Sequence, residues 1–178
     1  MACLTARRFT WRMTVRTVTL FAAALVSGLS AGLFYSYACS VMPGLGRSSD
    51  RTFVEGMQGI NVAIINPVFM VTFLGTAVLT GLAVLLYLPA SVRGVLPWII
   101  AGLVLYLATL VITFAVNIPL NNQLMAAGEP DRIADLAAVR LKFETTWVRW
   151  NIVRALTSTA AFACLAWALL AQSRSTAS

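Results

Sequence analysis

Four long apolar runs, separated by short polar segments, dominate the pattern of the chain. They cover approximately residues 18–42, 63–88, 95–118 and 147–171. Each reaches the roughly 20 residues that an α-helix needs to cross the hydrocarbon core of a bilayer. The first run is too long for the apolar region of a signal peptide, which has about 7–15 residues. The pattern therefore predicts an all-α fold, a membrane four-helix bundle with up-down topology.

Two of the connections carry helical patterns of their own. Residues 50–61 place apolar side chains at helical spacing, which predicts a short interfacial helix. Residues 130–143 begin with Pro130 at the first helical position and an acid next, a favourable helix start. We expect this second helix to run on into the fourth span. The transmembrane domain then covers residues 17–172, between a basic tail (1–16) and a short C-terminal tail (173–178).

Composition supports a membrane protein with a single domain. The chain of 178 residues is 60% hydrophobic and only 11% charged, with a mean hydropathy of +0.84. Soluble domains are about a quarter charged. The net charge of +7 is spread over the tail and the loops and forms no basic stripe, so no nucleic-acid partner is expected.

The arginines of the tail predict the orientation. Arg7, Arg8, Arg12 and Arg16 precede the first span, and with them the Lys and Arg residues number six on each side of the membrane. The rule that cytoplasmic flanks are positive is usually dominated by the first helix. We therefore expect both termini in the cytoplasm.

The residue types restrict the possible chemistry. The chain has no His, and Cys3, Cys39 and Cys164 are far apart in the sequence. Imidazole is the commonest metal ligand and the usual general base. We therefore expect no metal site and no thiol-based motif.

Polar residues gather where the spans meet one face of the membrane. The ends of spans 1 and 3 and the starts of spans 2 and 4 all fall on the face opposite the termini. Polar side chains in lipid turn inward or mark a pathway. The candidate residues are Tyr35, Tyr37, Asn61, Asn66, Asn117, Asn121, Asn122, Trp147, Asn151 and Arg154.

Span 4 has the sharpest part of this pattern. Trp147, Asn151 and Arg154 occupy positions i, i+4 and i+7, which is one stripe of a helix. Arg154 lies two turns inside the apolar segment, where a guanidinium must find acceptors. Candidates are amide carbonyls, a tyrosine oxygen, Glu144 or a ligand anion.

Two prolines are expected to shape the neighbouring spans. Asn117 and Asn121 are again four residues apart, and Pro119 between them clashes with the carbonyl of Ala115 and frees it. Asn66 precedes Pro67 and is therefore pushed away from the helical region. We expect a bend there that turns Asn66 inward.

Three interpretations of the polar residues remain open. They could form an amide network that holds the bundle together, although such bonds contribute only about 1 kcal/mol or less each. They could line a ligand or active-site pocket, which a buried arginine favours because its charge is costly. A proton or ion pathway needs acids within the spans, and residues 63–118 contain none.

Several motifs together resemble a known family. They are "GLFYSYACSVMPGL", "FVEGMQGINVAIINPVF", "NIPLNNQL" and "TTWVRWNIVRA". This set resembles the DUF1772 family of small membrane proteins, which includes the anthrone oxygenases of polyketide pathways. The N-x-P-x-N-N and W-x-x-x-N-x-x-R patterns are its most specific parts. The resemblance extends from about Gly32 to Leu170, and the basic tail is not part of it.

The resemblance implies a four-helix protein of the bacterial plasma membrane that oxidises an anthrone to an anthraquinone with O₂ and without a cofactor. Such an enzyme needs an apolar slot, a base and donors for the developing oxyanion. On this reading Asn117, Asn121, Asn151 and Arg154 hold the anion and Glu144 is the base, with Tyr35 as the other option. Tyr35, Asn61, Asn66 and Trp147 would bind a planar aromatic substrate.

A non-catalytic role is the alternative. The chain would then be a small-molecule binder, or the partner of a transporter or an assembly, with a structural Asn/Arg network. The sequence leaves both the enzymatic activity and the oligomeric state open.

Overall fold

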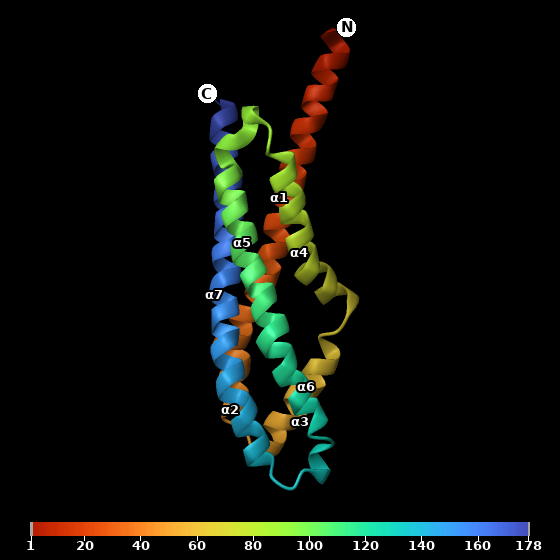
Figure 1. The fold of residues 1–178 in the computed structure, drawn as a ribbon, viewed down its shortest axis with the longest axis vertical. Coiled ribbons are helices and arrows are strands. Elements are labelled where there is room, and N and C mark those ends of the chain that lie inside the picture. Colours follow the sequence, from red (N-terminus) through yellow and green to blue (C-terminus); the bar gives the residue numbers. More distant parts are fainter. Residues whose placement is uncertain (1, 178) are drawn as a thin grey trace.

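The four long apolar helices pack as a bundle in the computed structural model, with the short helix α3 at one end (Figure 1). The structure describes the backbone of residues 2–177 and the side chains of residues 11, 13–89 and 93–173. The elements are α1 (Ala2–Ser36), η1 (Tyr37–Val41), α2 (Met42–Gly46), α3 (Asp50–Ala63), α4 (Pro67–Leu86), η2 (Ala90–Val95), α5 (Leu96–Ile112), η3 (Thr113–Asn117), α6 (Ile118–Ala126), η4 (Pro130–Arg132) and α7 (Leu136–Ala177).

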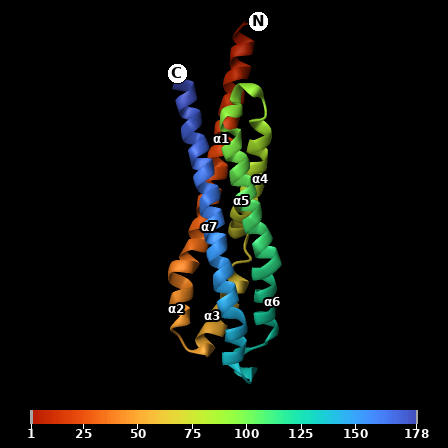
Figure 2. The same ribbon diagram turned by 60° about the vertical axis from the view of Figure 1, so that its left-hand side comes forward.

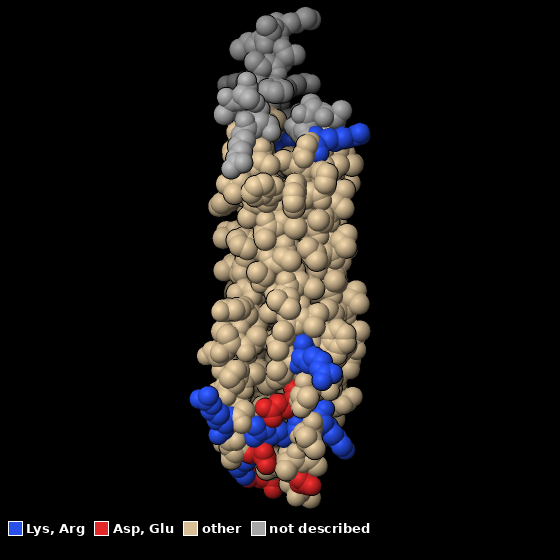
Figure 3. Space-filling model, turned by 90° about the vertical axis from the view of Figure 1, so that its left-hand side faces the viewer, with Lys and Arg blue, Asp and Glu red and all other residues tan. Residues whose placement is uncertain are grey.

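The predicted up-down arrangement of four spans is confirmed. Four segments are long and apolar enough to cross a membrane, namely Met13–Gly46, Pro67–Leu86, Arg93–Ala126 and Leu136–Ser173. Both ends of the chain lie at the same end of the bundle (Figures 1 and 2). Figure 3 shows a wide band without charged residues, and acidic side chains only at the end opposite the termini.

The structure leaves the orientation in the membrane as a prediction. The side chains of Arg7, Arg8 and Arg12, which carry that prediction, lie outside the described residues. Helix α1 itself begins at Ala2, so it includes most of the segment that was expected to be a tail.

The helix expected in the first connection is present as α3. The side chain of Ser49 caps it by accepting a hydrogen bond from the backbone N–H of Thr52 at 3.2 Å. Its apolar face is buried in a cluster at this end of the bundle, which consists of Met42, Phe53, Val54, Met57, Leu124, Phe143 and Trp147. This end cluster packs α3 against α6 and α7.

The prediction that a helix starts at Pro130 is wrong. Residues Pro130–Arg132 form only the 3-10 turn η4, and α7 starts at Leu136. The backbone at Ile133 is extended, which lets this side chain pack against the end cluster. The carboxylate of Asp135 then accepts a hydrogen bond from the N–H of Ala138 at 2.9 Å and caps α7. This cap and the burial of Ile133 together outweigh the favourable helix start at Pro130.

Two π-helical segments, η1 and η3, interrupt the first and third spans. The N–H of Met42 donates to the carbonyl of Tyr37, and the N–H of Ile118 donates to that of Thr113, five residues back in each case. A proline, Pro43 or Pro119, lies two residues beyond each segment. Because a proline has no N–H and crowds the carbonyl four residues earlier, the register shifts there to the wider turn. The third span thus continues as helix to Ala126, beyond the end expected near residue 118.

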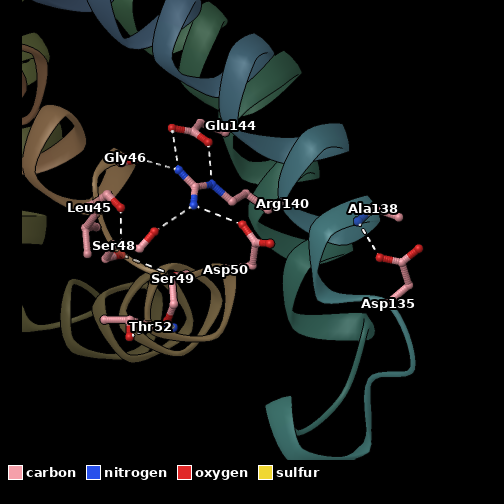
Figure 4. A network of polar contacts seen from close by, with 10 residues as sticks. All are labelled: Leu45, Gly46, Ser48, Ser49, Asp50, Thr52, Asp135, Ala138, Arg140 and Glu144. Atoms are coloured by element: carbon pink, nitrogen blue, oxygen red, sulfur yellow. Dashed lines mark hydrogen bonds and ion pairs between the residues drawn. The ribbon is translucent and has the colours of Figure 1, made fainter.

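Arg140, in the second turn of α7, fastens the turn between α2 and α3 (Figure 4). Its Nε lies 2.6 Å from a carboxylate oxygen of Glu144, and its Nη1 lies 3.0 Å from Asp50 Oδ1. The same guanidinium donates to the backbone carbonyls of Gly46 (2.7 Å) and Ser48 (3.0 Å). These partners come from both sides of the turn, so one side chain holds α2 and α3 against α7.

We predict that Arg140→Ala lowers the thermal unfolding midpoint of the purified protein by roughly 5 °C, because it leaves two carboxylates and two carbonyls without their donor. Arg51→Ala is the matched control, since Arg51 pairs with Asp131 at the exposed surface. Exposed ion pairs contribute little, so its midpoint should stay near that of the wild type. Equal midpoints for the two variants would contradict this role of Arg140.

Candidate functional site

A cavity of ≈ 670 Å³ lies inside the bundle, below the end that α3 covers. Its wall is formed by residues of α1, η1, α3, α4, η3, α6 and α7. Most of the lining side chains are apolar. The polar ones include Tyr37, Asn61, Asn121 and Arg154, with the Trp147 ring among them.

Arg154 is the one charged residue on this wall, and it is 95% buried. Its Nη2 donates to Asn151 Oδ1 at 3.0 Å, and its Nη1 donates to Thr113 Oγ1 at 3.3 Å. Among the described residues it has no carboxylate within ion-pair distance. A cation in an apolar interior is therefore held by neutral groups alone, and its charge remains available to a ligand.

Aromatic rings provide the rest of the environment of Arg154. The centre of its guanidinium lies 4.6 Å from the ring centroid of Phe34 and 5.3 Å from that of Trp147. Cation–π contacts of desolvated groups contribute about 2 kcal/mol or more. They offset part of the cost of burial without neutralising the charge.

Asn151 positions Arg154. It is fully buried, and its Nδ2 donates to the backbone carbonyl of Phe34 at 3.1 Å. Its Oδ1 is thereby turned toward the guanidinium. The predicted stripe of Trp147, Asn151 and Arg154 is confirmed as one buried face of α7.

Trp147 connects this stripe to the amides of the third span. Its Nε1 donates to Asn121 Oδ1 at 2.7 Å, and its backbone carbonyl accepts from Asn117 Nδ2 at 3.4 Å. The Tyr37 ring packs on it with centroids 5.8 Å apart. The amides predicted to share a face therefore do meet α7, and they fix the indole in the wall of the cavity.

Three buried polar atoms at the site have no hydrogen-bond partner in the structure. They are Arg154 Nε, Asn61 Nδ2 and Asn117 Oδ1. Arg154 on α7 and Asn61 on α3 both line the cavity, while the two unpaired nitrogens themselves are buried in its wall. Buried polar groups are almost always paired, so unpaired ones beside a cavity are an unusual feature of this part of the described chain.

Five residues that the sequence analysis assigned to the site do not line the cavity. Asn117 and Asn151 are buried against the lining residues Trp147 and Arg154. The other three lie elsewhere. Glu144 is engaged by Arg140 at the end of the bundle. Tyr35 is 62% exposed on the outer surface. The predicted bend at Asn66 is present, with φ −132° and ψ 159°, but its side chain caps α4 by accepting from the N–H of Phe69 at 3.0 Å.

Other residues take part although the sequence analysis gave them no role: Tyr37 was named only as a candidate, and Thr113 and Phe34 were not named. Tyr37 lines the cavity in place of Tyr35, and Thr113 and Phe34 provide partners of Arg154. Thr113 lies four residues before Asn117, which is a detectable signal of a shared helix face. No group of three or more His, Cys, Asp or Glu side chains in the described part of the chain could hold a metal ion.

A family model described as anthrone oxygenase matches residues 68–164, which is more than half of the chain. The chain belongs to the anthrone oxygenase family. A comparison with curated proteins and one with solved structures found no match. The matched segment of this anthrone oxygenase family member runs from the start of α4 into α7 and contains Asn117, Asn121, Trp147, Asn151 and Arg154. Tyr37 and Asn61, on the facing wall, lie outside it.

We predict unequal effects on the free energy of unfolding for the two members of the buried Asn151–Arg154 pair. Arg154→Met removes a costly charge and should change the free energy of unfolding by no more than about 1 kcal/mol. Asn151→Leu leaves the guanidinium without its acceptor and should destabilise by about 2–4 kcal/mol. Unfolding in detergent micelles measures both. The variant that carries both substitutions should be much less destabilised than Asn151→Leu alone. If the two changes in the free energy of unfolding simply add, the coupling between the residues is contradicted.

Proposed function

We propose that this protein is an oxygenase of the anthrone oxygenase type, which converts a planar aromatic substrate to a quinone with O₂. The observation that carries the proposal is the buried Arg154, uncompensated by any acid, in the wall of an apolar cavity. Family membership supports the reaction class. No group beyond the side chains of this chain is needed in the scheme.

The size and the walls of the cavity suit a flat polycyclic molecule. Pockets for small organic ligands range from about 300 to 1,000 Å³, and this one has ≈ 670 Å³. Phe69 and Phe73 stack nearly parallel in its wall, with centroids 5.1 Å apart and planes at 13°. Phe34 meets Phe73 edge to face. Such walls favour ring stacking and exclude water.

Arg154 and Asn61 would bind the substrate oxygen. An anthrone that loses its ring proton becomes a phenolate-like anion, with the charge centred on its oxygen. Arg154 and Asn61 both line the cavity, and a small rotation of each side chain would bring its unpaired N–H to that oxygen. Because the surroundings are apolar, these donors stabilise the anion more than they would in water.

The ring proton needs an acceptor, and Tyr37 replaces Glu144 and Tyr35 in this role. Tyr37 is the ionisable side chain that lines the cavity together with Arg154. In its ionised form, the phenolic oxygen takes the proton as negative charge passes to the substrate oxygen. The anion then reduces O₂ and forms a carbon–oxygen bond with it, and the resulting hydroperoxide loses water to give the quinone. The balance is anthrone plus O₂ to anthraquinone plus H₂O.

We expect the purified, reconstituted protein to consume O₂ and to form anthraquinone from an anthrone without added metal or cofactor. Arg154→Met should lower the rate by roughly 100-fold or more, because the developing charge loses its main partner. Arg149→Met is the matched control, since Arg149 is exposed on the same helix and should retain the rate. Absence of turnover above the spontaneous rate would overturn the proposal and favour a non-catalytic small-molecule binder.

A second pair of variants separates the candidate bases. Tyr37→Phe should lower the rate by about 10²-fold or more and remove its rise with pH, because the group that accepts the proton is gone. Glu144→Gln should leave the pH profile of the rate unchanged, since this carboxylate is bound by Arg140. The opposite result would return the role of the base to Glu144.

A further inference from the structure

The cavity reaches the outer surface at the side of the bundle. Several of its lining residues are exposed and apolar, with exposed fractions of 65% for Val62, 77% for Ile65, 55% for Phe114 and 40% each for Met70 and Met125. They belong to the end of α3, the break before α4, the start of α4, η3 and α6. We call these five residues the side rim.

The side rim lies at the depth where the hydrocarbon layer begins. Helix α4 has 20 residues and is therefore about 30 Å long, the thickness of the hydrocarbon core of a bilayer. Its first residue, Pro67, thus marks one border of that layer. Met70 lies one turn inside this border, and Ile65 lies immediately outside it. The opening therefore faces the acyl chains and the adjacent interface.

The water-facing end of the cavity is covered. Phe53, Met57 and Leu124 of the end cluster are almost completely buried there. The Nε2 of Gln58, on α3, donates to the backbone carbonyls of Leu124 and Gly128, both at 3.0 Å. These bonds hold α3 to the end of α6, and Arg140 holds the other end of α3 to α7 (Figure 4).

We propose that the ligand reaches the cavity from the bilayer, through the side rim between α4 and the η3–α6 segment. This inference rests on the proposed function and names its substrate class: an uncharged, membrane-dissolved, planar aromatic molecule that carries a carbonyl or hydroxyl oxygen. Uncharged rings pass the apolar rim at low cost. A permanently charged ring would lose its hydration in passing and gain no partner there. Ionisation takes place only after the oxygen has reached Arg154.

The test measures ligand association with the full-length protein in phosphatidylcholine nanodiscs. The probe is anthraquinone, whose binding quenches tryptophan fluorescence, and the loss of quenching in Trp147→Phe assigns the signal to the cavity. Val62→Phe with Ile65→Phe fills the rim without changing the tryptophan content. Val68→Phe with Val71→Phe is the matched control, because these valines are 77% and 66% exposed and do not line the cavity.

We expect the rim variant to slow association by roughly tenfold, because the added rings narrow the path between α4 and the η3–α6 segment. The control should behave as the wild type does, and anthraquinone sulfonate should cause little quenching. Equal association rates in the rim variant and the wild type would overturn the side entrance, as would equally fast binding of the sulfonate.

The outcome is distinguishable from a failure of the proposed function. An unchanged association rate in the rim variant, with anthrone turnover intact in the wild type, overturns the entrance alone. If anthraquinone association is slower in the rim variant and the wild type shows no anthrone turnover, the side entrance is supported and the proposed oxygenase function is overturned. Absence of both binding and turnover in the wild type overturns both.

Discussion

The burial of one guanidinium in an apolar bundle is the constraint that organises this molecule. An unpaired charge in such a place costs several kcal/mol, so everything around Arg154 has to supply dipoles or rings. Asn151 Oδ1 and Thr113 Oγ1 both accept hydrogen bonds from its guanidinium. The rings of Phe34 and Trp147 surround it. These contacts hold α1, η3 and α7 together around the guanidinium, and the cavity lies beside them.

The prolines extend this constraint to the backbone. Pro43 and Pro119 each force a π-helical segment into a span, and both segments border the cavity. The wider turn rotates the residues within it relative to those before it. Tyr37 and Thr113, the first residues of the two segments, both face the site. Irregular helix geometry is tolerated at membrane depth where the backbone is buried in protein or lines a cavity.

Arg140 and Arg154, two arginines of α7, differ in their surroundings and therefore in what their charges can do. Arg140, at the wet end, is compensated by Glu144 and Asp50 and holds the turn between α2 and α3. Arg154, about four helical turns further along the same helix, has no acid and a donor to spare. The first interaction closes the end of the bundle over the cavity. The second places a charge in the wall of the enclosed space, and the proposed oxygenase function rests on that charge.

Hydropathy and helical period determined the four spans, the up-down order, α3 and the buried stripe of α7, because these features depend on local sequence and on the cost of burying polar groups. Tertiary structure decided which polar side chains meet. Tyr35 and Tyr37 are equivalent candidates in the sequence, but residues two apart point to opposite sides of a helix, and packing selects Tyr37. Two other predicted site residues bind nearer partners: Glu144 accepts from Arg140, and Asn66 caps the start of α4. Such competition between close partners depends on distances that only the folded bundle defines.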